Sequence, residues 1–309
     1  MPQVMDRREF LSRSLWGAIP LTLAGSTVWG QQPAQRGPAV NGPQAAAPQQ
    51  QQVPQQQEVP QPNPQVVAIL RNWEISSGGF SKLEGAFERY VYDDVFGVEK
   101  RSVGEFQYQQ PDKGRLDFRV PKEVPATNPG RKTKTGAPFK VVADTPQRWV
   151  CTGKEVLIID DQMKTVQKVS IPPQFQGQNI ADGPLPFLFG MKAEKALQRY
   201  SLSIGAKHSA QVYHLVAKPL FRQDAQEWQV AEVMLNPANF MPRAIRTIDP
   251  AGTRDTVYVF QQEAMKQDPR WIFSPFEVTS LGLRGYNVIQ ETTAEAPPES
   301  KPAPKSIIK

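Results

Sequence analysis

The chain has 309 residues, with 36 Lys and Arg against 30 Asp and Glu, one cysteine and two histidines. A single cysteine cannot form an internal disulfide, which excludes a disulfide-stabilised secreted scaffold. One cysteine and two histidines are too few for a standard zinc site. No apolar run reaches the roughly 20 residues that span a bilayer, which excludes a polytopic membrane protein.

The first 30 residues have the pattern of an export signal. An Arg-Arg pair at 7–8 precedes Phe-Leu at 10–11, and an apolar stretch follows over 15–29. Such a charged start, apolar segment and small-residue end predict a signal peptide cleaved after Gly30. The Arg-Arg-x-Phe-Leu order resembles a twin-arginine signal, and an ordinary Sec signal or an uncleaved anchor is the alternative. The predicted localisation is periplasmic or otherwise exported.

Both flanks of the central region have the composition of disordered segments. Residues 31–65 contain 13 Gln and 8 Pro. The segment has too few large apolar side chains for their burial to offset the conformational entropy lost on ordering. We expect a Gln/Pro-rich disordered linker there and a disordered C-terminal tail over 291–309. The remaining segment, 66–290, is predicted to be one domain. Its charge is 29 minus 24, or +5, and is interspersed, so nucleic acid is not a predicted partner.

The central domain is predicted to begin with a helix that ends at Gly78-Gly79. Its apolar positions at helical spacing are Val66, Ile69, Leu70 and Trp73. Period-two alternation and β-branched or aromatic content then predict strands. The predicted strands are 83–95, 98–109, 116–120, 147–152, 155–160, 165–171, 200–204, 211–217, 227–235, 242–249 and 255–262.

Three segments interrupt this series of strands. Residues 122–139 contain the basic run 131–134 among prolines, which indicates a loop; a solvated loop is preferred to a contact with an anion or anionic lipid. An apolar segment predicts a second helix over 185–200. Residues 271–288 fit either a docking loop or an edge strand. Because short turns join antiparallel strands, the pattern predicts an α+β, mainly antiparallel β fold: a large curved sheet forming an unclosed β-barrel, with helices on its concave face.

Several motifs, in order along the chain, resemble the LolA/LolB lipoprotein-carrier superfamily, and more narrowly a secreted planctomycetal branch of it. These motifs are Leu83-x-Gly85-x-Phe87, Gly104-x-Phe106, the Pro111–Leu116 step into a strand, the hairpin 150–160, Leu185-Pro186-Phe187-Leu188-Phe189, Leu215-x-x-Lys218-Pro219 and Asp249-Pro250-Ala251-Gly252. The resemblance implies a LolA-like domain over 66–290. It also implies a non-catalytic carrier whose concave interior holds acyl chains of lipoproteins under a helical lid.

One position departs from the family pattern. The family has an arginine before the proline of the third-strand motif, where it secures the closed lid, and this chain has Gln110. The lid-locking role is therefore not carried over. The retention of lipoprotein transport and the identity of the ligand stay open.

The sequence contains no nucleophile elbow, phosphate-binding loop or dinucleotide fingerprint. We interpret the Asp93-Asp94 and Asp160-Asp161 pairs as turn caps, with a calcium site as the alternative. Cys151 is expected to be a small buried residue rather than a reactive thiol. His208 and His214 are not expected to bind metal. No enzyme activity, cofactor or metal is predicted.

The predicted site is a hydrophobic cavity between the sheet and the 185–189 segment, although the same residues also suit a filled core. The predicted ligand-binding residues are Phe87, Phe106, Phe118, Leu157, Leu185, Leu188 and Phe189. The predicted partner is a hydrophobic ligand or the acyl chains of a lipoprotein. A peripheral membrane contact is a further possibility, and the protein is predicted to be a monomer. A structural or interaction protein of the cell envelope, with the same fold and a filled core, is the competing hypothesis.

Overall fold

The computed structural model describes residues 63–171, Pro173, Gln176 and 192–291, which all lie in the same structural unit. The predicted signal peptide, the linker up to Pro62 and the tail beyond Glu291 lie outside the described residues. The 185–191 part of the predicted second helix also lies outside them.

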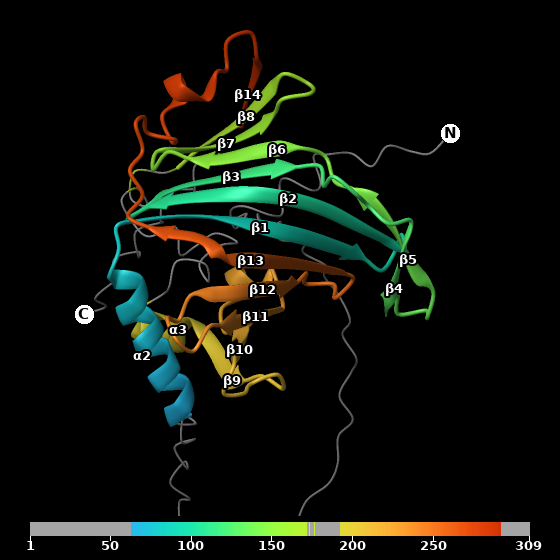
Figure 1. Ribbon diagram of the computed structural model, residues 1–309, viewed down its shortest axis with the longest axis vertical. Coiled ribbons are helices and arrows are strands. Elements are labelled where there is room, and N and C mark those ends of the chain that lie inside the picture. Colours follow the sequence, from blue (N-terminus) through green and yellow to red (C-terminus); the bar gives the residue numbers. More distant parts are fainter. Residues whose placement is uncertain (1–62, 172, 174–175, 177–191, 292–309) are drawn as a thin grey trace, which may run out of the picture. The chain divides into compact units, whose positions relative to one another are not determined.

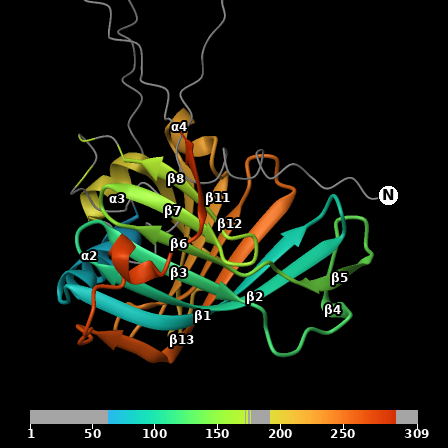
Figure 2. The same cartoon turned by 90° about the horizontal axis from the view of Figure 1, so that it is seen from above.

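The described residues form one 14-stranded sheet in the order β14-β8-β7-β6-β3-β2-β1-β13-β12-β11-β10-β9, with β5 joined to β2 and β4 to β5. Figures 1 and 2 show this path bending at β13, so that β9 to β12 turn under β1 to β3. The strands are β1 (Lys82–Asp93), β2 (Val98–Gln109), β3 (Lys113–Arg119), β4 (Thr127–Lys132), β5 (Pro138–Ala143), β6 (Gln147–Cys151), β7 (Glu155–Asp160), β8 (Thr165–Ser170), β9 (Tyr200–Ile204), β10 (Tyr213–Pro219), β11 (Val230–Leu235), β12 (Pro242–Ile248), β13 (Arg254–Gln267) and β14 (Asn287–Glu291).

The sheet is unclosed and mainly antiparallel, as predicted. Its two path ends, β14 and β9, do not pair with each other among the described strands. Two strand pairs are parallel, β14 with β8 and β2 with β5, and the remaining pairs are antiparallel. The placement of helices over the concave face stays a prediction.

Helix α2 (Pro64–Gly78) ends at Gly78, as the sequence predicts, but its first residues, Pro64 and Gln65, fall within the segment 31–65 that was predicted to be linker. The Asn63 side chain accepts a hydrogen bond from the Gln65 backbone N–H at 2.9 Å, and Pro64 occupies the first turn. The other helices among the described residues are α3 (Ala193–Arg199), α4 (Arg222–Ala225) and the 3-10 helix η3 (Val278–Leu281). No helix in the described ranges is long and apolar enough to cross a membrane.

The prediction of a loop over 122–139 is wrong in part, because β4 occupies residues 127–132 and β5 begins at Pro138, whereas residues 122–126 and 133–137 are not strand. Arg131 forms an ion pair with Asp255 of β13 and places its guanidinium 3.8 Å from the centroid of the Tyr92 ring. Lys134 donates to the Gly252 carbonyl, and Thr133 is buried. These tertiary contacts hold β4 and the turn after it in place, although the proline-rich, basic composition of the segment does not favour a strand.

The 271–288 segment contains both of the structures considered for it. Its first part packs Phe276 and Leu281 into buried positions and includes η3. Its last part enters β14, an edge strand paired in parallel with β8. Short turns between strands predict only antiparallel pairs. The pairing of β14 with β8 is parallel and was not predicted, because parallel strands are joined by long connections.

Candidate functional site: the inward face of the sheet

Two glycine–phenylalanine pairs build the centre of the sheet. Gly85 lies directly opposite Phe106, and Phe87 directly opposite Gly104, across β1 and β2. A Cβ at Gly104 would lie 2.4 Å from Phe87 Cζ, and one at Gly85 would lie 2.7 Å from Phe106 Cε1. Each ring therefore lies over the bare backbone of the other strand, which gives the Gly-x-Phe motifs of the sequence a packing role. We call the face that carries these rings the inward face.

Aromatic rings continue along the inward face on both sides of Phe87. Phe87 makes edge-to-face contacts with Phe118 and Tyr258, at centroid distances of 5.4 and 5.6 Å. Phe118 continues to Trp149 at 4.9 Å, and Phe106 contacts Phe260 at 5.7 Å. Edge-to-face pairs at these distances add to the stabilisation from burial alone.

Arg89 occupies the same face, and its side chain is 4% exposed. Its guanidinium carbon lies 4.3 Å from the centroid of the Phe118 ring, and the group forms an ion pair with Asp144. Burial alone lowers the pKa of Arg89, but the Tyr258 hydroxyl and the Asp144 carboxylate more than offset this, and the pKa is raised. The sequence interpretation did not select Arg89 as a site residue. The sequence did contain an indication of its role, because Arg89 is a charged residue at a position of β1 where the alternation predicts an apolar one.

The structure brings together three of the predicted ligand-binding residues. Phe87, Phe106 and Phe118 are 1%, 0% and 2% exposed and belong to one hydrophobic cluster. Leu185, Leu188 and Phe189 lie outside the described residues. Ligand binding by any of these side chains stays a prediction.

Leu157 lies elsewhere, and its predicted place on the inward face is wrong. It is directly opposite Val150 and belongs to a second cluster with Ile159, Val166 and Leu281, on the other face of the sheet. Four successive residues of β7 are buried. Both faces of this strand are therefore covered, and alternation cannot tell one from the other.

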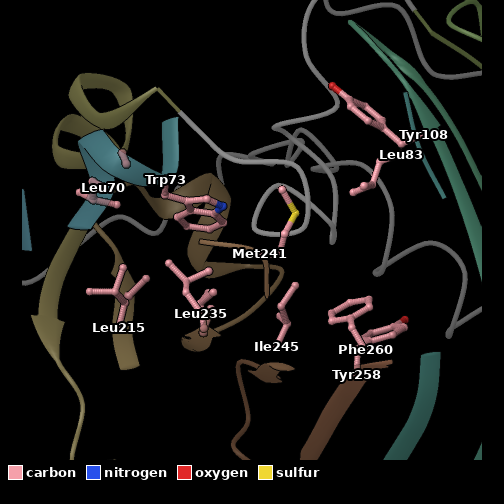
Figure 3. Close-up of a cluster of buried hydrophobic side chains, with 14 of the residues drawn as sticks. Leu70, Trp73, Leu83, Tyr108, Leu215, Leu235, Met241, Ile245, Tyr258 and Phe260 are labelled. Carbon is pink, nitrogen blue, oxygen red and sulfur yellow. The ribbon is translucent and has the colours of Figure 1, made fainter. Parts of the chain in front are cut away.

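Helix α2 packs its apolar residues into the inward-face cluster. Figure 3 shows Leu70 and Trp73 of α2 pointing toward Leu215 and Leu235 of the sheet. The Glu74 carboxylate accepts a hydrogen bond at 3.0 Å from the backbone N–H of Ala193, the first residue of α3. An anionic acceptor at a helix N-terminus is favourable, so Glu74 ties α3 to α2.

Gln110 fixes the end of α2 by a neutral contact. Its side-chain N–H donates to the Phe80 carbonyl at 2.9 Å and reaches the Ser77 carbonyl in the last turn of α2 at 3.4 Å. The residue at the family's arginine position thus holds the C-terminal end of α2 against the β2–β3 turn. The contact carries no net charge.

The first aspartate of each pair caps a turn, as interpreted, whereas Asp161 instead forms an ion pair with Arg148. Asp93 accepts from the backbone N–H groups of Val95 and Phe96, and Asp160 from those of Gln162 and Met163. No cluster of three or more potential metal ligands occurs in the described part of the chain.

Cys151 and the histidines have structural contacts. Burial raises the pKa of the Cys151 thiol to about 11, which opposes formation of a reactive thiolate at neutral pH. His208 stacks on Tyr213 at 5.5 Å. His214 is buried, and its Nδ1 accepts from the Lys207 backbone N–H at 3.1 Å. Its Nε2 lies 3.3 Å from a Glu232 carboxylate oxygen, without hydrogen-bond geometry.

Glu227 is expected to make the protein less stable as the pH rises above about 4.5. Burial, with the Asp224 carboxylate nearby, raises the pKa of Glu227 to about 7. Between the usual pKa of about 4.5 and 7, the unfolded chain releases this proton while the folded chain keeps it, so stability falls with pH. Glu227→Gln should therefore melt higher than the parent at pH 8 and equally at pH 4. The measurement is thermal unfolding at both pH values, with exposed Glu263→Gln as the control. An equal offset at both pH values would contradict the assignment.

One surface loop presents two large apolar side chains. Ile272 and Phe273 are 91% and 80% exposed. The residues on either side are held in place: the Trp271 indole N–H donates to Glu84 at 2.8 Å, and Ser280 donates to the Ser274 carbonyl at 2.8 Å. We call residues 272–273 the apolar tip.

No protein-family model matches the chain, and no curated protein matches it. Among solved structures, an uncharacterized conserved protein from Thermus thermophilus matches at 12% identity and a TM-score of 0.38, covering 72% of this chain and 98% of that one. A putative outer membrane lipoprotein-sorting protein domain from Vibrio parahaemolyticus matches at 12% identity and 0.35, covering 66% and 93%. A LolA superfamily protein from Nitrosomonas europaea matches at 10% identity and 0.31, covering 66% and 94%.

The likeness to LolA-superfamily proteins that the sequence motifs predict is thus also found among solved structures. The planctomycetal branch stays a prediction.

Proposed function

We propose that this chain is an exported, non-catalytic carrier that holds the acyl chains of a hydrophobic ligand or lipoprotein against the inward face of its sheet. One observation carries the proposal: a single apolar cluster extends over the inward face of an unclosed sheet and includes residues of α2 and α3. In this proposal α2 and α3 cover the concave face. An apolar face with a helical cover is the geometry that suits a long aliphatic ligand.

The aromatic packing favours a second candidate, a structural or interaction protein of the cell envelope. The Phe87 ring directly contacts the rings of Phe118 and Tyr258, and all three residues are less than 9% exposed. Rings packed in this way fill the interior near β1 as an ordinary core does.

Lipid extraction of the protein purified from the native envelope fraction separates the two candidates. The carrier proposal expects acyl lipids in near-stoichiometric amount by mass spectrometry. A lipid-free protein that also fails to bind added fatty acyl ligands would leave the structural role. N-terminal sequencing of the same sample tests export, and the expected mature chain begins near Gln31.

The apolar tip is proposed as the point of peripheral membrane contact. Its two side chains already stand exposed on a loop held at both ends, so entry into a bilayer interface requires little rearrangement. The double substitution Ile272→Ser with Phe273→Ser should reduce binding to anionic phospholipid vesicles several-fold without lowering the melting temperature. Vesicle co-sedimentation measures this. Ile75→Ser, at a 73% exposed position on α2, is the matched control. Equal binding by the double variant and the parent would refute the proposal.

A further inference from the structure

Three buried side-chain donors on the inward face have no hydrogen-bond acceptor among the described residues. They are Arg89 Nε, Ser102 Oγ and Trp149 Nε1. Arg89 and Ser102 are 4% and 2% exposed. Buried polar groups in folded proteins are nearly always paired, so each such donor requires an explanation.

The three donors belong to one neighbourhood. Arg89 of β1 and Ser102 of β2 are directly opposite each other, which places their Cβ atoms about 4.5–5.5 Å apart. The Arg89 guanidinium carbon lies 5.8 Å from the Trp149 ring centroid. Phe118 lies between these elements, 4.3 Å from the same guanidinium carbon and 4.9 Å from the Trp149 ring.

The surroundings define the chemistry of a group that would bind there. An N–H of arginine and an N–H of indole can only donate, and a hydroxyl can donate, so the missing group is an acceptor. The positive charge of Arg89 is already balanced by Asp144. A carboxylate would place a second negative charge beside Asp144 in a buried site, which is unfavourable. A neutral carbonyl oxygen satisfies the donors without this repulsion.

We propose that Arg89 Nε, Ser102 Oγ and Trp149 Nε1 form a polar subsite that binds the carbonyl oxygen of an acyl ester or amide. The phenylalanine rings on either side contact the aliphatic chain. The subsite rests on the proposed carrier function and extends it, because it selects esterified or amidated acyl chains over free fatty acids.

Dye displacement by methyl laurate, laurate and tridecane tests the subsite in the full chain. Ser102→Ala and Trp149→Phe each remove one donor and keep most of the packing. Each should weaken methyl laurate binding about three- to tenfold, the effect of losing one buried hydrogen bond, and leave tridecane binding unchanged. The melting temperature without ligand should not fall for Ser102→Ala, since the variant loses only an unpaired hydroxyl. Ser203→Ala, at an exposed position on β9, is the matched control.

The outcomes separate the subsite from the carrier function. Equal losses for methyl laurate and tridecane, or no loss for either, would overturn the subsite while the carrier function stands. Tighter binding of laurate than of methyl laurate would overturn the preference for a neutral carbonyl. Failure of the parent protein to bind any of the three ligands would overturn the carrier function, and the subsite with it.

Discussion

Phe118→Ala is expected to lower the free energy of unfolding by about 3–5 kcal/mol, the range for truncating a large aromatic side chain in a packed interior. Phe118 is 2% exposed and contacts the rings of Phe87 and Trp149 as well as the guanidinium of Arg89. Its removal leaves a space bordered by rings that cannot collapse without moving β1 or β6. Urea denaturation at constant m-value measures the loss.

The control for this prediction is Phe96→Ala in the turn between β1 and β2. Phe96 is 63% exposed, so its truncation should change stability by no more than about 0.5 kcal/mol. A loss below about 1 kcal/mol for Phe118→Ala would show that the inward face is loosely packed there. Such a face is expected of a ligand cavity rather than a filled core. The same two variants, titrated with a fluorescent fatty acyl ester, show whether the truncated space changes ligand affinity.

Alternation was sufficient to predict β1 and β2 because β1, and β2 from Ser102 to Tyr108, have one buried and one partly exposed face. In β1 every second residue from Leu83 to Val91 is buried. In such a strand, apolar residues alternate with polar ones along the sequence, so the sequence itself indicates which face is buried. The register was not predicted, and the structure explains the Gly-x-Phe motifs through it, since each glycine lies directly opposite the ring that needs the space.

The wrong predictions concern residues whose neighbours in the structure lie far away in the sequence. Leu157 was predicted to lie on the wrong face because both faces of β7 are buried. On the outer face it packs in a cluster with Leu281, which is far away in the sequence. The extended conformation at Arg131 depends on Asp255 of β13 and on the Tyr92 ring. No local pattern within residues 122–139 contains this information.

The candidate subsite shows the same limit. Arg89 stood in the apolar phase of β1, and this was visible in the sequence. Its partner Asp144 follows β5, and the ring beside it, Trp149, belongs to β6. Only the sheet order, which places β1 and β6 on the two sides of β2 and β3, brings these side chains together.

Asp144→Ala is expected to destabilise the protein by about 3–5 kcal/mol, because it leaves the Arg89 charge buried without its counter-ion. The Arg89 and Asp144 side chains are 4% and 14% exposed, so water replaces the lost carboxylate poorly. For comparison, Arg119 and Glu105 form an exposed pair, with side chains 55% and 62% exposed. Glu105→Ala should change stability by about 1 kcal/mol or less. Chemical denaturation measures these changes in stability. The double-mutant cycle consists of the parent, Asp144→Ala, Arg89→Met and the variant with both substitutions.

The double variant Arg89→Met with Asp144→Ala should be more stable than Asp144→Ala alone. Methionine is close to arginine in length and suits contact with the Phe118 and Trp149 rings, so it removes the unpaired charge while keeping much of the packing. Recovery in the double variant identifies the buried charge, rather than the lost volume of the carboxylate, as the source of the destabilisation. If Asp144→Ala alone costs less than about 1 kcal/mol, the guanidinium has another counter-charge or reaches solvent, and the charge balance that favours a neutral carbonyl ligand does not hold. The same cycle therefore tests the electrostatic basis of the subsite without any ligand present.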